Sequence, residues 1–241
     1  MNVDATHKAR QQAPDLKAGI VRRAVQVFVT LAIQAAILFL AAGRLDWVWA
    51  WVFIGLYLAG VAVNASFMLR YSPETVAERS KAKGIKVWDL IFGGLFAIMY
   101  MVIAPLIAGL DVRFGWTGPL ALAVHLAGAV AFALGFALLI WAMASNAYFA
   151  TIVRIQEDRG HTVCDTGPYR FVRHPGYVSA IIHALAVPLM LGSPWALIPG
   201  VVGALALVVR TALEDRTLHD ELAGYGEYAA RVGYRLLPGV W

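Results

Sequence analysis

The stretch "YVSAIIHALAVPLMLGSPWALIPGVVGALALVVR", Tyr177–Arg210, has no charged side chain before its final arginine. A membrane-spanning helix needs roughly 20 mostly apolar residues. Two such runs lie here, at about 175–192 and 194–213. Because Ser193-Pro194 cannot continue a helix smoothly, we expect it to separate two helices. The stretch therefore predicts a tight hairpin of two membrane helices.

Four further apolar runs precede the hairpin, at about 24–42, 47–69, 89–110 and 119–145. Hydrophobic residues make up 60% of the 241-residue chain and charged residues 15%, and the mean hydropathy is +0.67. These values predict an all-α, polytopic integral membrane protein with about six transmembrane helices. After the hairpin, polar residues 214–235 carry apolar side chains at helical spacing, which predicts an amphipathic tail helix on the membrane surface. Those side chains are Leu218, Leu222 and Tyr225.

The basic residues are distributed unevenly along the chain. Six spans place both termini on one side, and 18 of the 20 lysines and arginines then lie on that side. Only Arg44 and Arg113 lie on the other. The positive-inside rule therefore predicts cytoplasmic N- and C-termini, and we expect a bacterial inner membrane. Since the excess positive charge is explained by topology, it does not indicate a nucleic-acid partner.

The segment "GPYRFVRHPGY", Gly167–Tyr177, places cations and aromatic rings at the start of the fifth run. The topology signal alone would explain the arginines. It does not explain Tyr169, His174 and Tyr177 arranged around them. Pro175 suits the first helical position, so His174 is expected at the helix cap, beside free backbone donors. Such an arrangement suits a ligand with a carboxylate and a flat base.

Arg210 and Glu214 stand one helical turn apart at the end of the sixth run. One interpretation is a simple ion pair that ends a membrane helix. The hairpin, however, returns this end to the neighbourhood of His174. Tyr169, His174, Tyr177, Arg210 and Glu214 are therefore predicted to share one cavity. Ionisable residues at membrane depth are candidates for function.

From Asn146 to the C-terminus the chain resembles the isoprenylcysteine carboxyl methyltransferase family and, more distantly, the phospholipid methyltransferases. The similar elements are "NAYF" (Asn146–Phe149), "RIQEDRGHTV" (Arg154–Val163), "GPYRFVRHPGY" (Gly167–Tyr177), "RTALED" (Arg210–Asp215) and "GYGEYAARVGYRLLPGVW" (Gly224–Trp241). The resemblance divides the chain into four N-terminal transmembrane helices, 1–145, and a methyltransferase core, 146–241. The core would contain a cofactor-binding loop, the hairpin and the tail.

The resemblance implies S-adenosylmethionine as methyl donor and no metal. It places a substrate-orienting, catalytic role on Arg210. The implied cofactor contacts are Gln156, His161, Thr162, Val163, Cys164, Tyr169, His174, Pro175, Tyr177 and Glu214. The chain departs from the family in having Glu214-Asp215 where a Glu-Glu pair is common, and the first acid is expected to matter more. It also has Cys164 at a usually aliphatic position.

The acceptor is expected to be lipophilic, recruited from the membrane lipids, and a carboxylate (O-methylation). A carboxylate acceptor is already anionic and needs no general base. An amine or phospholipid acceptor must lose a proton, for which the pocket offers only His161, His174 or Glu214. Two other classes stay open. A sterol-type NADPH-dependent reductase carries a similar Arg-His-Pro-x-Tyr element, and a membrane scaffold or transporter would be no enzyme.

Overall fold

The computed structural model describes residues 3–79 and 85–241, with side chains from Leu16 onward. The regular elements of these residues are all helical. They are α1 (Val3–Ala42), α2 (Val48–Tyr71), α3 (Pro73–Glu78), α4 (Val87–Ile98), the π-helix η1 (Met99–Ile103), α5 (Ala104–Phe114), α6 (Leu122–Ser145), the 3-10 turns η2 (Glu157–Arg159) and η3 (Gly167–Arg170), α7 (Pro175–Leu191), the 3-10 turn η4 (Pro194–Ala196), α8 (Leu197–Glu221) and α9 (Tyr225–Arg231).

Five helical stretches of the described chain are long and apolar enough to cross a membrane. They are Leu16–Ala42, Val48–Tyr71, Val87–Phe114, Leu122–Ser145 and Pro194–Glu221. The remaining apolar helix, α7, is shorter, at 17 residues. Each of the six predicted apolar runs is therefore a helix. The prediction of an all-α, polytopic membrane protein is confirmed.

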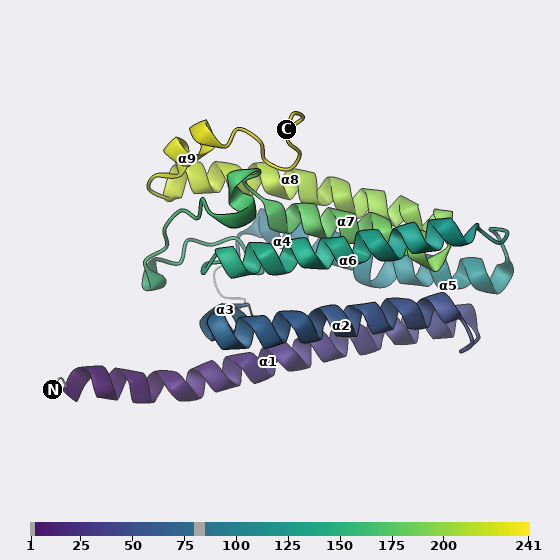
Figure 1. Ribbon diagram of the computed structural model, residues 1–241, viewed down its shortest axis with the longest axis horizontal. Helices are drawn as coiled ribbons and strands as arrows, with labels where there is room; N and C mark the ends of the chain where they lie inside the picture. The colour runs from purple at the N-terminus through teal and green to yellow at the C-terminus, as the bar shows by residue number, and fades with distance from the viewer. Residues whose placement is uncertain (1–2, 80–84) are drawn as a thin grey trace.

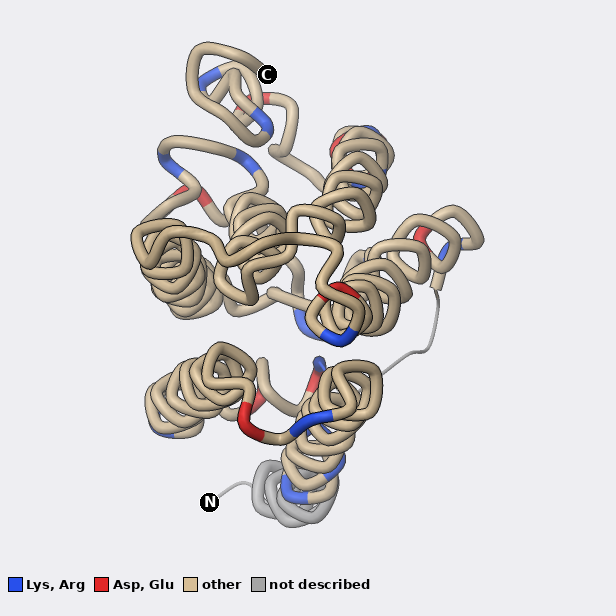
Figure 2. Tube along the Cα trace, turned by 90° about the vertical axis from the view of Figure 1, so that its right-hand side faces the viewer, with Lys and Arg blue, Asp and Glu red and all other residues tan. Residues whose placement is uncertain are grey.

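The helices form two groups (Figure 1). α1 and α2 lie on one side of α4 to α8 (Figure 2). α1 packs closely against α5, where a Cβ atom at Gly109 would lie 2.6 Å from Ala41 Cβ. Buried apolar residues such as Phe53 of α2, Phe132 of α6 and Met190 of α7 join the groups in one core. α6 and α7 approach closely at Gly128, where a Cβ atom would lie only 2.4 Å from Met190 N. Only glycine permits that contact.

The predicted hairpin is present, and its turn begins where expected. α7 ends at Leu191, and Gly192 follows with a φ of +79°, which is the left-handed region that favours glycine. The Ser193 side chain caps the next turn by accepting a hydrogen bond from Ala196 N. Ser193 Oγ also donates to Asp111 Oδ2 at 2.6 Å, which ties the turn to the end of α5. The Ser-Pro break is therefore confirmed.

The predicted tail helix 214–235 is wrong in its extent and its surroundings. α8 continues as far as Glu221, the chain turns at Gly224 with a φ of +80°, and only Tyr225–Arg231 form α9. The expected apolar face, including Leu218 and Leu222, packs against the segment between α6 and α7 and not along a membrane surface. The spacing correctly predicts an apolar face, but other parts of the protein cover that face.

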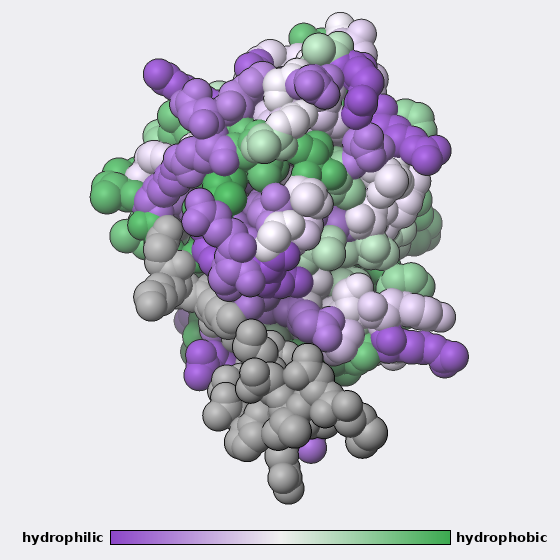
Figure 3. All heavy atoms as spheres, turned by 90° about the vertical axis from the view of Figure 1, so that its left-hand side faces the viewer, coloured by the Kyte–Doolittle hydropathy of each residue, from purple (hydrophilic) through white to green (hydrophobic). Residues whose placement is uncertain are grey.

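Hydrophilic residues gather at the end of the bundle that holds α9 and the segment between α6 and α7 (Figures 1 and 3). We call this the polar end. The chain between α6 and α7, residues 146–174, forms an ordered loop there with two short 3-10 turns. Its packing against α8 and α9 is apolar and includes Tyr169, Tyr225 and Tyr228. This second, smaller core positions the candidate site.

Candidate active site

A cavity of about 810 Å³ begins at the polar end and extends between the helices. Its walls come from α1, α2, the α3 region with Arg79, α4, η1, α6, α7, α8, α9 and the 146–174 loop. The five residues predicted to share a cavity all line it: Tyr169, His174, Tyr177, Arg210 and Glu214. The prediction that the hairpin brings them together is confirmed. The volume lies within the range of about 300–1,000 Å³ that is usual for small-molecule sites.

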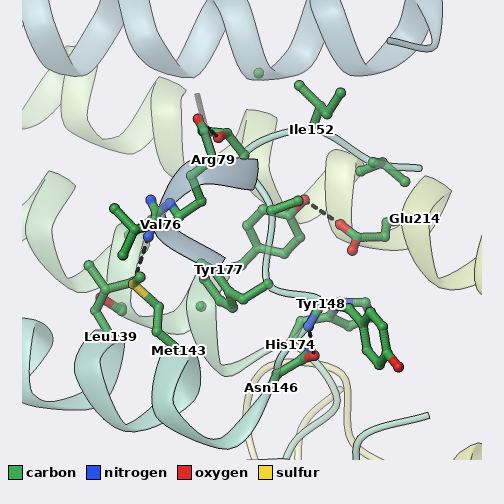
Figure 4. Close-up of a pocket in the computed structure, with 18 of the residues that line it drawn as sticks. Val76, Arg79, Leu139, Met143, Asn146, Tyr148, Ile152, His174, Tyr177 and Glu214 are labelled. Atoms are coloured by element: carbon green, nitrogen blue, oxygen red, sulfur yellow. Dashed lines mark hydrogen bonds between the residues drawn. The ribbon is translucent and has the colours of Figure 1, made fainter. Parts of the chain in front are cut away.

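The hydroxyl of Tyr177 donates a hydrogen bond to the carboxylate of Glu214 (Figure 4). This bond joins the first turn of α7 to the far half of α8. None of the ion pairs formed among the described residues includes Glu214. The carboxylate therefore lines the cavity with its charge uncompensated at contact distance.

Arg210 does not form the simple ion pair with Glu214 that was considered from the sequence. Its Nε donates to Asp89 Oδ1 at 2.6 Å, and its Nη2 donates to the carbonyl of Thr151 at 2.9 Å. The guanidinium carbon lies 5.2 Å from the centroid of the Tyr177 ring, a distance at which a cation–π attraction acts. Arg210 is therefore held in the cavity, with its charge balanced from α4.

Asp89 is a site residue that the sequence analysis missed. It is buried in the first turn of α4, and its second carboxylate oxygen accepts a hydrogen bond from Val153 N at 2.9 Å. It therefore fixes both Arg210 and the loop. The available signal was a lone carboxylate at the start of an otherwise apolar span, where an unpaired charge is costly.

Asp215 lies at the centre of a buried network. Its carboxylate accepts hydrogen bonds from Arg173 Nε at 2.8 Å, Tyr225 Oη at 2.8 Å and Arg235 Nε at 2.8 Å, and it lies 3.2 Å from His174 Nε2. The residue is 1% exposed. These contacts fasten the start of α7, α8 and the tail to one another. The sequence favours Glu214 over Asp215 as the acid that matters more, and it does not indicate this structural role of Asp215.

His174 is the N-cap of α7 and Pro175 is its first residue, as predicted. The expected free backbone donors are not all free, because Tyr177 N and Val178 N both bond to the His174 carbonyl, at 3.0 and 3.3 Å. The imidazole contacts Asp215 and lies 3.4 Å from the Tyr225 hydroxyl. His174 thus lines the cavity while its Nε2 is engaged in the buried network.

Besides Tyr169 and His174, the loop supplies four more of the predicted cofactor contacts to the cavity: His161, Thr162, Val163 and Cys164. Two others, Gln156 and Pro175, are not among the cavity-lining residues. Gln156 is buried, donates to the carbonyl of Tyr148 at 2.6 Å and accepts from Arg159 at 2.6 Å. The structure therefore places Gln156 in support of the loop. Pro175 begins α7 without reaching the cavity.

His161, in the middle of this loop, lies in surroundings that favour the neutral imidazole. Burial, and then the nearby charges of Arg159 and Arg154, lower the pKa of His161 to about 4. Its Nδ1 accepts a hydrogen bond from the backbone N–H of Gln156 at 3.3 Å, and its ring lies 4.4 Å from that of Tyr148. A neutral imidazole beside a phenol ring offers a flat, polarisable surface to a ligand. It is a weak base.

The fold and the site together define a polytopic helical membrane protein with a small-molecule cavity at its polar end. Residues 127–220 match the isoprenylcysteine carboxyl methyltransferase (ICMT) family. This region of the chain is therefore similar to that family, which is one of membrane methyltransferases. The match begins within α6 and includes every predicted site residue from Gln156 to Glu214. A search of curated proteins gives no significant match.

Proposed function

We propose that this protein is an S-adenosylmethionine-dependent methyltransferase that acts on a lipophilic carboxylate drawn from the membrane. The observation that carries the proposal is the Glu214 carboxylate, which is hydrogen-bonded by Tyr177 and lines the cavity without an ion-pair partner among the described residues. A cationic cofactor would compensate this charge. The family match over the same residues supports the chemistry.

The residues present fit S-adenosylmethionine, which supplies a methyl group on a positively charged sulfonium. Glu214 would accept hydrogen bonds from its ammonium or ribose hydroxyls. The rings of Tyr148, Tyr169 and Tyr177, which all line the cavity, would flank its base or attract its sulfonium. Of the predicted cofactor contacts, Gln156 and Pro175 would act indirectly, through the loop and the helix start.

The described side chains favour a carboxylate acceptor over an amine. An amine must lose a proton, but the pKa of His161 lies near 4 because of burial and two arginines. The Nε2 of His174 contacts the buried Asp215 carboxylate. Glu214 accepts a hydrogen bond from Tyr177 and would bind the cofactor. A carboxylate acceptor needs none of these groups as a base, since it is anionic before it reacts. The protein would then act by excluding water and aligning the acceptor, a task for which Arg210 has donors available.

The acceptor would enter from the bilayer. Beyond its polar mouth, the cavity is walled by apolar residues of four membrane-spanning helices, including Val27, Leu58, Phe96 and Leu139. Such walls suit a hydrocarbon chain. The polar donor would enter from the opposite, aqueous side, so that the two reactants meet at the polar end.

Calorimetry on the purified protein tests the cofactor. The protein is expected to bind S-adenosylmethionine, and NADPH far more weakly. Glu214→Ala should weaken S-adenosylmethionine binding by about 1–3 kcal/mol, the cost of removing a charged hydrogen-bond partner. Glu221→Ala is the matched control, because that carboxylate lies on the same helix and pairs with Lys86 outside the cavity. Tight NADPH binding without a response to S-adenosylmethionine would favour a reductase.

We further propose that the polar end faces the cytoplasm of a bacterial cell, with both termini on that side, since 18 of 20 basic residues favour it. Cysteine labelling in a Cys164→Ala background tests this orientation. Leu45→Cys, at an exposed position between α1 and α2, is expected to react with an impermeant reagent added to intact cells. Glu227→Cys in α9 should react only after lysis. The reverse pattern would overturn the orientation.

A further inference from the structure

Two arginines outside the family-matched region line the same cavity without a carboxylate partner. They are Arg79, directly after α3, and Arg23 in α1. None of the ion pairs among the described residues includes either one. Among the described residues, Arg23 donates a hydrogen bond to the side chain of Gln26, at 3.4 Å. Arg79 Nε is buried and has no hydrogen-bond partner.

The surroundings of Arg79 do not balance its charge. Its Nη1 lies 2.6 Å from the thioether sulfur of Met143, a weak acceptor, and its guanidinium lies 5.2 Å from the centroid of the Phe149 ring. Burial, followed by the repulsion of Arg23, lowers the pKa of Arg79 to about 9, so the side chain is still cationic near pH 7. A partly buried cation whose Nε is buried and unpaired is costly unless an anion joins it.

This position lies next to the candidate site. A Cβ atom at Gly176 would lie 2.7 Å from the Phe149 ring, so the ring that Arg79 covers touches the residue before Tyr177. Figure 4 shows Arg79 on the same side of the pocket as Val76 and Met143, with the Tyr177–Glu214 pair opposite. One cavity therefore contains Arg79, the apolar residues beside it and the candidate site.

Arg79 and Arg210 differ in what they offer an anion. The charge of Arg210 is already matched by Asp89 at 2.6 Å. Arg210 can orient a bound group through its remaining donors, but it adds little net attraction. Arg79, with Arg23, supplies the uncompensated positive charge of the cavity. Arg79 would thus recognise the charge of the ligand, and Arg210 would orient its reacting group.

We propose that Arg79, assisted by Arg23, binds the anionic head of an amphiphilic carboxylate and selects the free acid over its methyl ester. That this ligand is the methyl acceptor rests on the proposed function, whereas the binding itself does not. Methylation removes the negative charge, so the same site would hold the substrate and release the product.

The experiment compares binding of dodecanoate and methyl dodecanoate to the protein in phosphatidylcholine nanodiscs, without S-adenosylmethionine. The wild type is expected to prefer the acid by about 10- to 150-fold, the range for a charged hydrogen bond. Arg79→Gln should reduce the preference to near one, and Arg23→Gln should reduce it in part. Arg22→Gln is the matched control, because it removes a neighbouring charge from an exposed side chain that does not line the cavity.

Several results would overturn the proposal. They are an absence of preference in the wild type, a full preference in folded Arg79→Gln, and Arg79-dependent competition by phosphatidylglycerol, which would indicate a lipid phosphate site. If Arg79→Gln does not fold, Arg79→Lys must retain part of the preference and Arg23→Gln must weaken it. An Arg79-dependent preference without S-adenosylmethionine binding would refute the methyltransferase proposal and leave this site standing.

Discussion

Asp215→Asn is expected to lower the free energy of unfolding by about 3–5 kcal/mol, the cost of removing one partner from a buried ion pair. The Asp215 carboxylate is 1% exposed and accepts hydrogen bonds from Arg173, Tyr225 and Arg235. Asparagine keeps the shape and removes the charge. The Arg173 guanidinium, itself buried, would then lack its counter-ion. Titration of the purified protein with a denaturing detergent measures the decrease in the free energy of unfolding.

Asp220→Asn is the control for this change. Asp220 lies on the same helix, and its ion pair with Arg216, at 4.0 Å, is between two exposed side chains. Such pairs contribute about 0–1 kcal/mol, so the control should unfold nearly as the wild type does. Equal stability of the two variants would show that the Asp215 network holds α7, α8 and the tail together less firmly than its geometry indicates.

Arg210→Ala is expected to reduce turnover of an amphiphilic carboxylate about 100-fold, the scale of losses that follow misplacement of a reactant. Affinity for S-adenosylmethionine should change little, because Glu214 and Tyr177 keep their own hydrogen bond. Arg210→Lys should restore little turnover, since an ammonium cannot reproduce the planar fork that bonds both Asp89 and Thr151. Single-turnover assays and calorimetry separate the two quantities.

Arg216→Ala serves as the matched control for Arg210→Ala, because Arg216 lies on the same helix with an exposed side chain and does not line the cavity. Asp89→Asn should give an intermediate loss of turnover, because it releases Arg210 without removing it. If Arg210→Ala lost cofactor affinity and turnover equally, Arg210 would be a support for the cofactor pocket. A mild effect on turnover would favour an amine or phospholipid acceptor.

The sequence by itself determined the helical membrane fold, the position of the hairpin and the set of five residues that share the cavity. These follow from properties that are local in the chain. Hydropathy over about 20 residues predicts a span, Ser193-Pro194 ends a helix, and a hairpin must bring Arg210 back toward His174. The apolar spacing of Leu218, Leu222 and Tyr225 was also evident, although not what covers it.

Only the tertiary structure decided which charges are balanced. Arg210 is paired with Asp89, a residue 121 positions away, and not with Glu214 one turn along the same helix. Asp215 is the centre of a buried network, and the Gln156 side chain hydrogen-bonds within the loop. Arg79 lines the cavity, and its Nε has no hydrogen-bond partner. An ion pair forms where helix packing brings two oppositely charged groups within about 4 Å. Hydropathy and motif spacing specify the helices but not that packing, so the partners of these charges appear only once the helices are assembled.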